Sequence, residues 1–365
     1  PTFGRNPSRS NIALYCLNNL VQFFHILAFF ESYHLTVNPN TMNINIKFNN
    51  IIFFLVVMLI NTSCILAPRP TQANFAYISN QGENSVSAIN TSTNRVIKTI
   101  AVGTAPVGVA VSSTLHRAYI SNVESQDITI INTQNHMVIG TIKVHGSPVG
   151  LALSPDSKTL YVADWFTNRV LAINTHHTEI VRELIIADAP AGLVVSPDNQ
   201  LLYVANRDSN DVAIIDTATL TIKQRINVGK HPYGIALSSS GIWLALVNVQ
   251  DDSVSLINTN NQVQQQFKVG YHPYCVAFSL DDKTLYITNT QDDSVTVIDI
   301  ATKKTIATIA VGNTPEGISL DHEHAYVANW GSSNVSVIDL HTNKVVATIK
   351  TGEKSRAFGQ FIIHQ

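Results

Sequence analysis

The sequence predicts an all-β fold, a seven-bladed β-propeller with four antiparallel strands in each blade. One observation is a tyrosine position that opens a strand and recurs after 42, 42, 42, 42, 41 and 40 residues. This position holds Tyr77, Tyr119, Tyr161, Tyr203, Ala245, Tyr286 and Tyr326. A second is a proline with the same period, at Pro106, Pro148, Pro190, Pro232, Pro273 and Pro315. A period of about 40 residues with about four strands is typical of propellers, and no segment shows the apolar stripe of a helical solenoid.

Each copy divides into the same four strands. The clearest copy, residues 326–350, reads strand, turn, strand, turn, strand, with β-branched runs separated by Asn, Asp, Gly and Ser. An innermost strand follows the proline, as at residues 107–112, and a turn leads to a second strand such as residues 160–163. The third strand ends at an Asn or Asp that sets the next turn, and the outermost strand follows, as at residues 345–349.

The innermost strands carry a further signature of blades packed face to face. Gly108, Ala110 and Ser112 lie two residues apart and share one face, while branched residues share the other. Small side chains on one face suit blades that taper toward a crowded axis. A flat β-sandwich with coincident spacing is the alternative, and seven copies in phase argue against it.

The two ends of the repeat region predict how the ring closes. The first copy lacks an innermost strand, and the last copy is followed by one extra segment, residues 357–364. Aligning Gly359 with Gly108 makes this segment the missing innermost strand of blade one. Closure from the opposite terminus would remove the open sheet edges that a gap leaves.

The first 74 residues read as separate from the repeat region at 75–365. Residues 11–30 are apolar and charge-free, but four polar side chains weaken a membrane-helix interpretation. Met42 begins a pattern of Lys47, an apolar run at 51–60 and small residues, which is the order of a secretory signal. We therefore expect residues 1–41 to be an upstream extension, 42–64 a signal peptide and 65–74 a linker. We expect the chain to be exported to the periplasm or cell envelope, with Cys64 as a candidate lipidation site.

Composition excludes several function classes. The formal net charge is −2 and no basic run occurs, so nucleic-acid binding is not expected. Three cysteines provide neither a disulfide framework nor a CxxC metal pair. The sequence contains no GxSxG, Walker or HExxH motif. No cofactor is expected.

The repeats contain the second-strand motifs YISN, YVAD, YVAN and YITN, the third-strand motifs VSVID and VTVID, and the loop motif VG-x-x-P-x-G. These motifs resemble those of the YVTN-repeat, YncE-like β-propellers. The resemblance covers residues 75–365, and ALVN at 245–248 departs from it. It implies a seven-bladed, exported or surface-associated propeller that acts as a binding or scaffold module. It supplies no catalytic residues.

Two loop positions carry the candidate ligand site. The residue before the proline position varies around the ring as Ala105, Ser147, Ala189, His231, His272, Thr314 and, by alignment, Arg356. The residue after it varies as Val107, Val149, Ala191, Tyr233, Tyr274, Glu316 and Phe358. We therefore predict a lopsided channel mouth whose polar-aromatic half contains His231, Tyr233, His272, Tyr274, Glu316 and Arg356. A metal held by His231, His272 and Glu316 is conceivable, but two similar HPY loops explain the pattern more simply.

A second set of side chains suggests a partner surface. Trp165, Arg207 and Trp330 share the position four residues after the tyrosine, and Phe166 adjoins Trp165. Each indole covering its own blade is the alternative. The QDDS sequence occurs twice, at 250–253 and 291–294. We interpret its aspartates as turn-forming residues and not as ligands of a calcium ion, because no glycine-spaced Asp-x-Asp loop is present. Cys275 replaces an innermost-strand glycine and is expected to be a buried small residue.

These observations favour a non-enzymatic exported propeller that binds a protein, glycan or small ligand on its loops. The first alternative is a lactonase-like hydrolase with a divalent metal in the central channel. The second is a DNA-binding propeller, which salt-sensitive binding in a gel shift would support.

Overall fold

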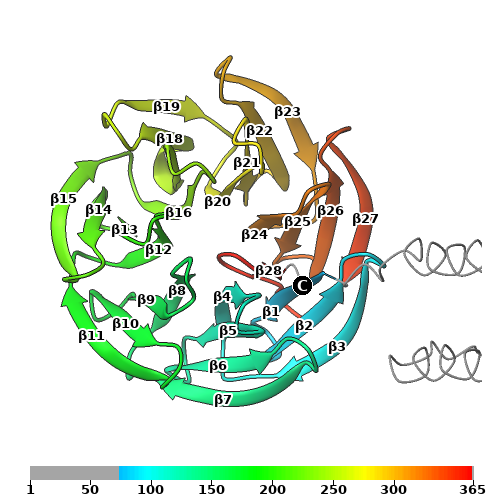
Figure 1. The fold of residues 1–365 in the computed structure, drawn as a ribbon. Helices are drawn as coiled ribbons and strands as arrows, with labels where there is room; N and C mark the ends of the chain where they lie inside the picture. The colour runs from blue at the N-terminus through cyan, green and yellow to red at the C-terminus, as the bar shows by residue number, and fades with distance from the viewer. Residues whose placement is uncertain (1–73, 364–365) are drawn as a thin grey trace, which may run out of the picture. The chain divides into compact units, whose positions relative to one another are not determined.

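The computed structural model describes residues 74–363, which form seven four-stranded antiparallel sheets arranged around a ring (Figure 1). This confirms the predicted seven-bladed propeller. The extension at 1–41, the signal at 42–64 with Cys64, residues 65–73 of the linker, and His364 lie outside the described residues. Among residues 74–363, no helix is long and apolar enough to cross a membrane.

The blades follow the chain in order, and each is numbered from its innermost strand outward. Blade one contains β28 (Ile362–Ile363), β1 (Phe75–Asn80), β2 (Ser85–Asn90) and β3 (Arg95–Ala101). Blade two contains β4 (Pro106–Ser112), β5 (Arg117–Asn122), β6 (Asp127–Asn132) and β7 (Met137–Lys143). Blade three contains β8 (Pro148–Leu153), β9 (Thr159–Asp164), β10 (Arg169–Asn174) and β11 (Glu179–Ile185). Blade four contains β12 (Pro190–Val195), β13 (Leu201–Asn206), β14 (Asp211–Asp216) and β15 (Thr221–Asn227).

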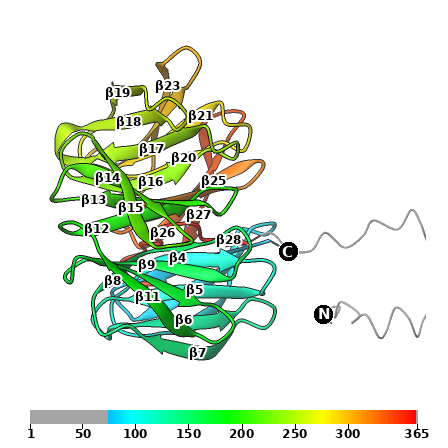
Figure 2. The same ribbon diagram turned by 60° about the vertical axis from the view of Figure 1, so that its left-hand side comes forward.

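The remaining blades repeat this order, and Figure 2 shows blades two and five at opposite ends of the ring. Blade five contains β16 (Pro232–Leu237), β17 (Trp243–Asn248), β18 (Ser253–Asn258) and β19 (Gln264–Lys268), with the short 3-10 helix η1 (Val249–Asp251) after β17. Blade six contains β20 (Pro273–Phe278), β21 (Thr284–Asn289), β22 (Ser294–Asp299) and β23 (Lys304–Ala310). Blade seven contains β24 (Pro315–Leu320), β25 (His324–Asn329), β26 (Asn334–Asp339) and β27 (Lys344–Lys350).

Antiparallel order within each blade defines two faces of the ring. The loops that enter the innermost strands lie on the same side as the loops between second and third strands, and we call this side the loop face. The turns that follow the innermost strands lie on the opposite side, which we call the turn face. Every blade therefore contributes two loops to the loop face, which is where the candidate site residues lie.

The repeated motif residues hold neighbouring blades together. In blade two the Ser121 hydroxyl accepts a hydrogen bond from Gly108 N–H at 2.7 Å and donates to the Val149 carbonyl of blade three at 3.0 Å. Thr288 makes the equivalent contacts in blade six, with Cys275 N–H and the Glu316 carbonyl. The hydroxyl of the Ser in YISN and of the Thr in YITN thus links its own blade to the next one.

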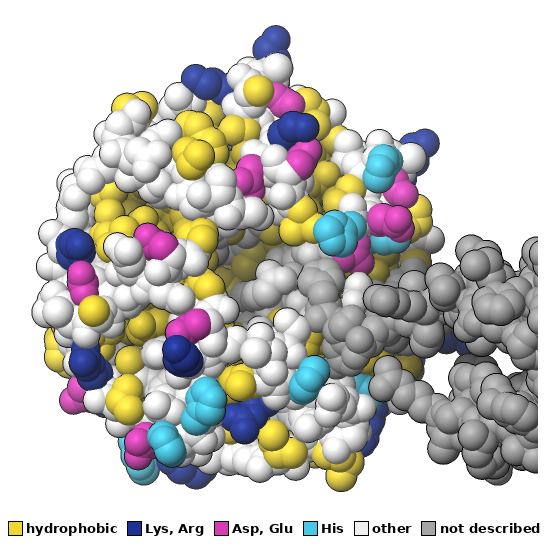
Figure 3. Space-filling model, viewed as in Figure 1, with side chains coloured by type: hydrophobic (Ala, Val, Ile, Leu, Met, Phe, Trp, Pro, Cys, Tyr) yellow, Lys and Arg dark blue, Asp and Glu magenta, His cyan; other side chains and the backbone are white. Residues whose placement is uncertain are grey.

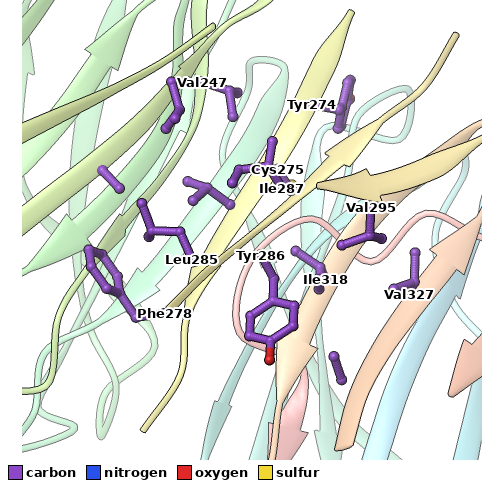
Figure 4. Close-up of a cluster of buried hydrophobic side chains, with 14 of the residues drawn as sticks. Val247, Tyr274, Cys275, Phe278, Leu285, Tyr286, Ile287, Val295, Ile318 and Val327 are labelled. Carbon is purple, nitrogen blue, oxygen red and sulfur yellow. The ribbon is translucent and has the colours of Figure 1, made fainter. Parts of the chain in front are cut away.

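The innermost-strand glycines allow these blades to approach closely. A Cβ built on Gly150 would lie 2.0 Å from the Ala191 carbonyl oxygen of the next blade, which is too close for any side chain. Cys275 occupies this repeat position in blade six and is 5% exposed, as expected for a buried small residue. Figure 4 shows it within the apolar cluster between blades five, six and seven, near Ile287 and Tyr274. Ala245, which replaces the tyrosine in blade five, is fully buried, and that blade keeps all four strands.

The C-terminal segment closes the ring, and the alignment through Gly359 gives the register of β28 but not that of residues 354–357. In β28, Ile362 pairs with Ala76 as Val111 pairs with Ala118 in blade two, which is the register that this alignment predicts. Ala357 N–H donates to the Ser79 hydroxyl at 2.8 Å, which is the contact that Gly108 makes with Ser121 in blade two. Tyr77 N–H then donates to the Phe361 carbonyl, and β28 pairs with β1. Ala357 therefore takes the Gly108 position, and the segment carries two extra residues before Phe361. Figure 1 shows this segment turning into the centre of the ring before it reaches β28.

Candidate functional site

The corrected alignment changes the repeat position of Arg356. Lys354 accepts the hydrogen bond from Gln81 N–H that Ala105 accepts from Val123 N–H in blade two. Lys354, not Arg356, therefore precedes the proline position, and Ser355 fills the proline position itself. Arg356 follows it, as Tyr233, Tyr274 and Glu316 do in blades five, six and seven. Phe358, which was aligned with these residues, belongs to the insertion.

Four side chains from this one repeat position form a connected polar cluster at the channel. The Tyr274 hydroxyl donates to the Tyr233 hydroxyl at 2.9 Å and accepts from Arg356 Nη2 at 2.5 Å. Arg356 Nε forms an ion pair with Glu316 Oε2 at 2.5 Å. Tyr233, Tyr274 and Glu316 are each less than 9% exposed. Blades five, six, seven and one thus place a continuous chain of polar contacts at the axis, on the half of the mouth that the sequence predicted.

Burial sets the protonation of this cluster. It raises the pKa of the Glu316 carboxyl to about 7, although the Arg356 guanidinium beside it lowers that pKa. Burial also raises the pKa values of the Tyr233 and Tyr274 hydroxyls, which are therefore neutral at neutral pH. The Glu316 carboxyl is consequently the titratable member of the cluster near physiological pH.

Aromatic rings pack around the cluster and connect it with the loop face. The ring of Tyr233 lies 4.9 Å from that of Phe358 and 5.6 Å from that of Trp165, centroid to centroid. The Arg207 guanidinium lies 5.4 Å from the Trp165 ring centroid, within cation–π distance. Phe166, next in the chain, is 76% exposed. We call Trp165, Phe166 and Arg207 the aromatic patch.

The fourth residue of the predicted partner surface lies elsewhere on the ring. Trp330 Nε1 donates to Gln81 Oε1 at 3.0 Å, and the Lys354 amine lies 5.1 Å from the Trp330 ring centroid. Trp330 therefore lies at the junction between blades seven and one, and its contacts are with blade one rather than with its own blade alone. Trp165 likewise contacts Tyr233 and Arg207 of other blades and packs on the buried cluster.

The two histidines are near the site but are not joined to it. His272 Nδ1 lies 3.0 Å from the Thr290 hydroxyl, and His231 Nε2 lies 4.0 Å from Asp208 Oδ1. Burial lowers the pKa of His231, and the Arg207 charge lowers it further. Within residues 74–363 no group of three or more His, Cys, Asp or Glu is placed to hold a metal. The structure thus does not assemble His231, His272 and Glu316 into a metal site.

The QDDS aspartates act in the loops, as the turn interpretation expects. Asp252 accepts a hydrogen bond from His272 N–H at 2.9 Å, and Asp293 accepts one from Thr314 N–H at 2.7 Å. His272 and Thr314 both have a positive φ, of 54° and 52°. These carboxylates therefore fix the strained residues that precede Pro273 and Pro315.

One contributor to the site was missed, the insertion that brings Phe358 to the axis. Its signal was present in the spacing of the VG-x-x-P motif. Gly352 precedes Ser355 by three residues, as Gly103 precedes Pro106. Counting from Gly352 aligns Arg356 with Tyr233. The closing segment then has two more residues than the other innermost segments, between Ala357 and Phe361.

Charged groups on the ring surface are mixed in sign. On the face drawn in Figure 3, Lys and Arg side chains alternate with Asp and Glu, and no region of one sign stands out. Some exposed charges of the ring are paired, such as Lys283 with Asp281 at 3.2 Å. This face therefore offers no continuous basic track for a nucleic-acid backbone.

Comparisons with known proteins support the fold. A family model described as "Lactonase, 7-bladed beta-propeller" matches residues 169–265, from β10 through part of β19. No curated protein matches the chain. The chain resembles the solved structure of Kuenenia stuttgartiensis hydrazine synthase, with 24% identity, a TM-score of 0.67, and coverage of 72% of this chain and 91% of that one.

Two further solved structures share the architecture at lower identity. One is a functionally unknown protein from Desulfotomaculum acetoxidans DSM 771, with 16% identity, a TM-score of 0.69, and coverage of 79% of this chain and 100% of that one. The other is dihydro-heme d1 dehydrogenase NirN in complex with DHE, with 15% identity, a TM-score of 0.60, and coverage of 79% and 66%. The chain is a seven-bladed β-propeller with a partial match to the lactonase propeller family.

Proposed function

We propose that the chain is a non-enzymatic binding module whose loop face contacts a protein partner through the aromatic patch. The observation that carries this proposal is Phe166, a large apolar side chain that is 76% exposed beside Trp165 and Arg207. Aromatic residues and arginine dominate the binding energy of protein interfaces. The packed Trp165–Tyr233 contact makes this surface rigid, which lowers the entropic cost of binding.

The proposal includes a location and a repeat type that rest on the sequence. We infer export to the periplasm or cell envelope from the leader at 42–64, with lipidation of Cys64 as the means of anchoring. We also infer that the repeats are of the YVTN type. Mass spectrometry of the mature N-terminus tests the leader, and retention of residues 1–41 would contradict export.

The experiment is a pull-down from the cell envelope with the full chain as bait. Three baits are compared: wild type, Phe166→Ala, and the control Val346→Ala, whose side chain is 55% exposed on β27. We expect one protein to be captured by wild type and by the control, and depleted with Phe166→Ala, since truncating an interface anchor costs about 2 kcal/mol or more. Equal capture by all three baits would contradict the role of the aromatic patch.

A lactonase-like hydrolase is the second candidate, and the family match over residues 169–265 favours it. That family implies a divalent metal held by carboxylates and amides in the channel. The residues described here do not fit such a metal, because the Glu316 carboxylate is paired with Arg356. Metal analysis followed by a lactone-hydrolysis assay distinguishes the candidates, and metal-dependent turnover would overturn the binding-module proposal.

A further inference from the structure

A cavity of about 460 Å³ lies inside the ring, below the polar cluster and apart from the aromatic patch. Its wall is formed by the innermost strands of blades three to six, from the glycine position to the end of each strand, together with Ala110 and Val111 of β4 and Ile318 and Leu320 of β24. Ser239 and Leu280, in the turns after β16 and β20, also line it. Because these turns lie on the turn face, the cavity opens there, opposite the loops that carry the candidate partner surface.

Residues 358–360 of the closing segment, which contain the two-residue insertion, form the floor of this cavity. Phe358, Gly359 and Gln360 all line it. The Phe358 carbonyl accepts a hydrogen bond from Val109 N–H at 2.8 Å, and Phe358 N–H donates one to the Val107 carbonyl at 3.1 Å. The insertion is therefore fixed to β4. Gly359 has a φ of 109°, which favours glycine, and a Cβ there would lie 2.6 Å from the Val109 carbonyl oxygen. The floor is therefore an ordered barrier between the cavity and the loop face.

The lining has the chemistry of a site for an uncharged ligand. None of the described residues that line the cavity is charged, and most are Gly, Ala, Val, Leu or Ile. A charged ligand would lose its hydration there without gaining a partner. The innermost strands of blades three to six pair within their sheets on one side only, so their free edges face the axis and offer backbone N–H and C=O groups. Gln360, which is exposed, adds a side-chain amide at the floor.

We propose that this cavity is a binding site for an uncharged, mainly apolar small molecule that enters from the turn face and rests on Phe358. The cavity volume lies within the range of about 300–1,000 Å³ found for small-molecule sites. Apolar walls with a few hydrogen-bonding groups are also the usual composition of such sites. Ligands of this class bind by burial of apolar surface, with the backbone edges selecting their orientation.

The test uses the full chain and the uncharged fluorescent probe N-phenyl-1-naphthylamine. We expect saturable binding at one site with a blue-shifted emission. Leu237→Trp, which places a larger ring in the cavity wall, should weaken binding by about tenfold or more. The matched control Ile97→Trp, on the outer strand β3 where the side chain is 47% exposed, should leave the affinity unchanged.

Two further measurements keep the proposal testable if Leu237→Trp does not fold. Leu153→Trp alters the wall from blade three and should have the same effect. Decanol should displace the probe from wild-type protein at least about tenfold more strongly than decanoate, because the lining offers no cation. The proposal is overturned if wild type shows no saturable probe binding, if the folded wall variant binds as wild type does, or if decanoate competes as well as decanol.

Discussion

Replacing Phe361 by alanine tests whether the C-terminal segment holds the ring closed. Phe361 is fully buried in the apolar cluster that joins blades seven, one and two. A buried Phe→Ala change costs about 3–5 kcal/mol, a large share of the roughly 5–15 kcal/mol that stabilises a folded domain. With a urea m-value of about 3 kcal/mol/M, the unfolding midpoint should fall by roughly 1–1.7 M.

The assay is equilibrium urea unfolding followed by circular dichroism, with Phe166→Ala as the matched control. Phe166 is 76% exposed, so its truncation should change stability by less than about 0.5 kcal/mol. Deletion of residues 355–365 should abolish the cooperative transition, because it removes the hydrogen bonds to Ser79 and Tyr77 as well. An unchanged midpoint for Phe361→Ala, or an unchanged melting temperature for the truncated chain, would refute closure by this segment.

Two other predictions concern blade packing and the buried carboxyl. Gly150→Ala should lower the melting temperature markedly, since its Cβ would lie 2.0 Å from a neighbouring carbonyl, whereas Gly140→Ala, whose Cβ would be 3.7 Å from its nearest neighbour, should not. Equal melting temperatures would contradict the close-approach argument. For Glu316, the pKa rises from 4.5 to about 7 on folding, so the folded state binds more protons between those pH values and stability should fall as pH rises through them. The loss in the free energy of unfolding is of order 3 kcal/mol. Urea midpoints measured from pH 4 to 8 should show this loss for wild type but not for Glu316→Gln. Parallel pH profiles for the two proteins would show that the carboxyl does not titrate in this window.

The blades could be predicted from the sequence because their determinants are local and repeated. The Tyr position, the terminal Asn or Asp, and the small residues of the innermost strand recur in phase, so seven weak signals support one another. The closing segment is present only once. The alignment through Gly359 predicts the register of β28 but misplaces residues 354–357, because it omits the two-residue insertion between them. The segment's Ala–Phe–Gly resembles the residues around Gly108, while the informative glycine, Gly352, lies before β28 by ten residues.

The candidate site was predictable as a set of positions but not as a set of contacts. Comparing equivalent loop residues brought Tyr233, Tyr274 and Glu316 to one half of the mouth. The Arg356–Glu316 ion pair and the hydrogen bond between the tyrosines depend on how the ring curvature directs long side chains across the axis. That geometry follows from the packing of all seven blades, which no single repeat encodes.

The closing segment also has a consequence for how the chain folds during synthesis. Ala357 and Ser79, which share a hydrogen bond, are 278 residues apart, and Tyr326 reaches Thr91 across 235 residues. Blade one therefore cannot be completed until nearly the whole repeat region has left the ribosome, while blades two to six can form in order. Contacts of such separation are slow to form, and until then β1 has an unpaired edge. We expect the nascent propeller to persist as an open arc, and to be most exposed to aggregation or chaperone binding at β1.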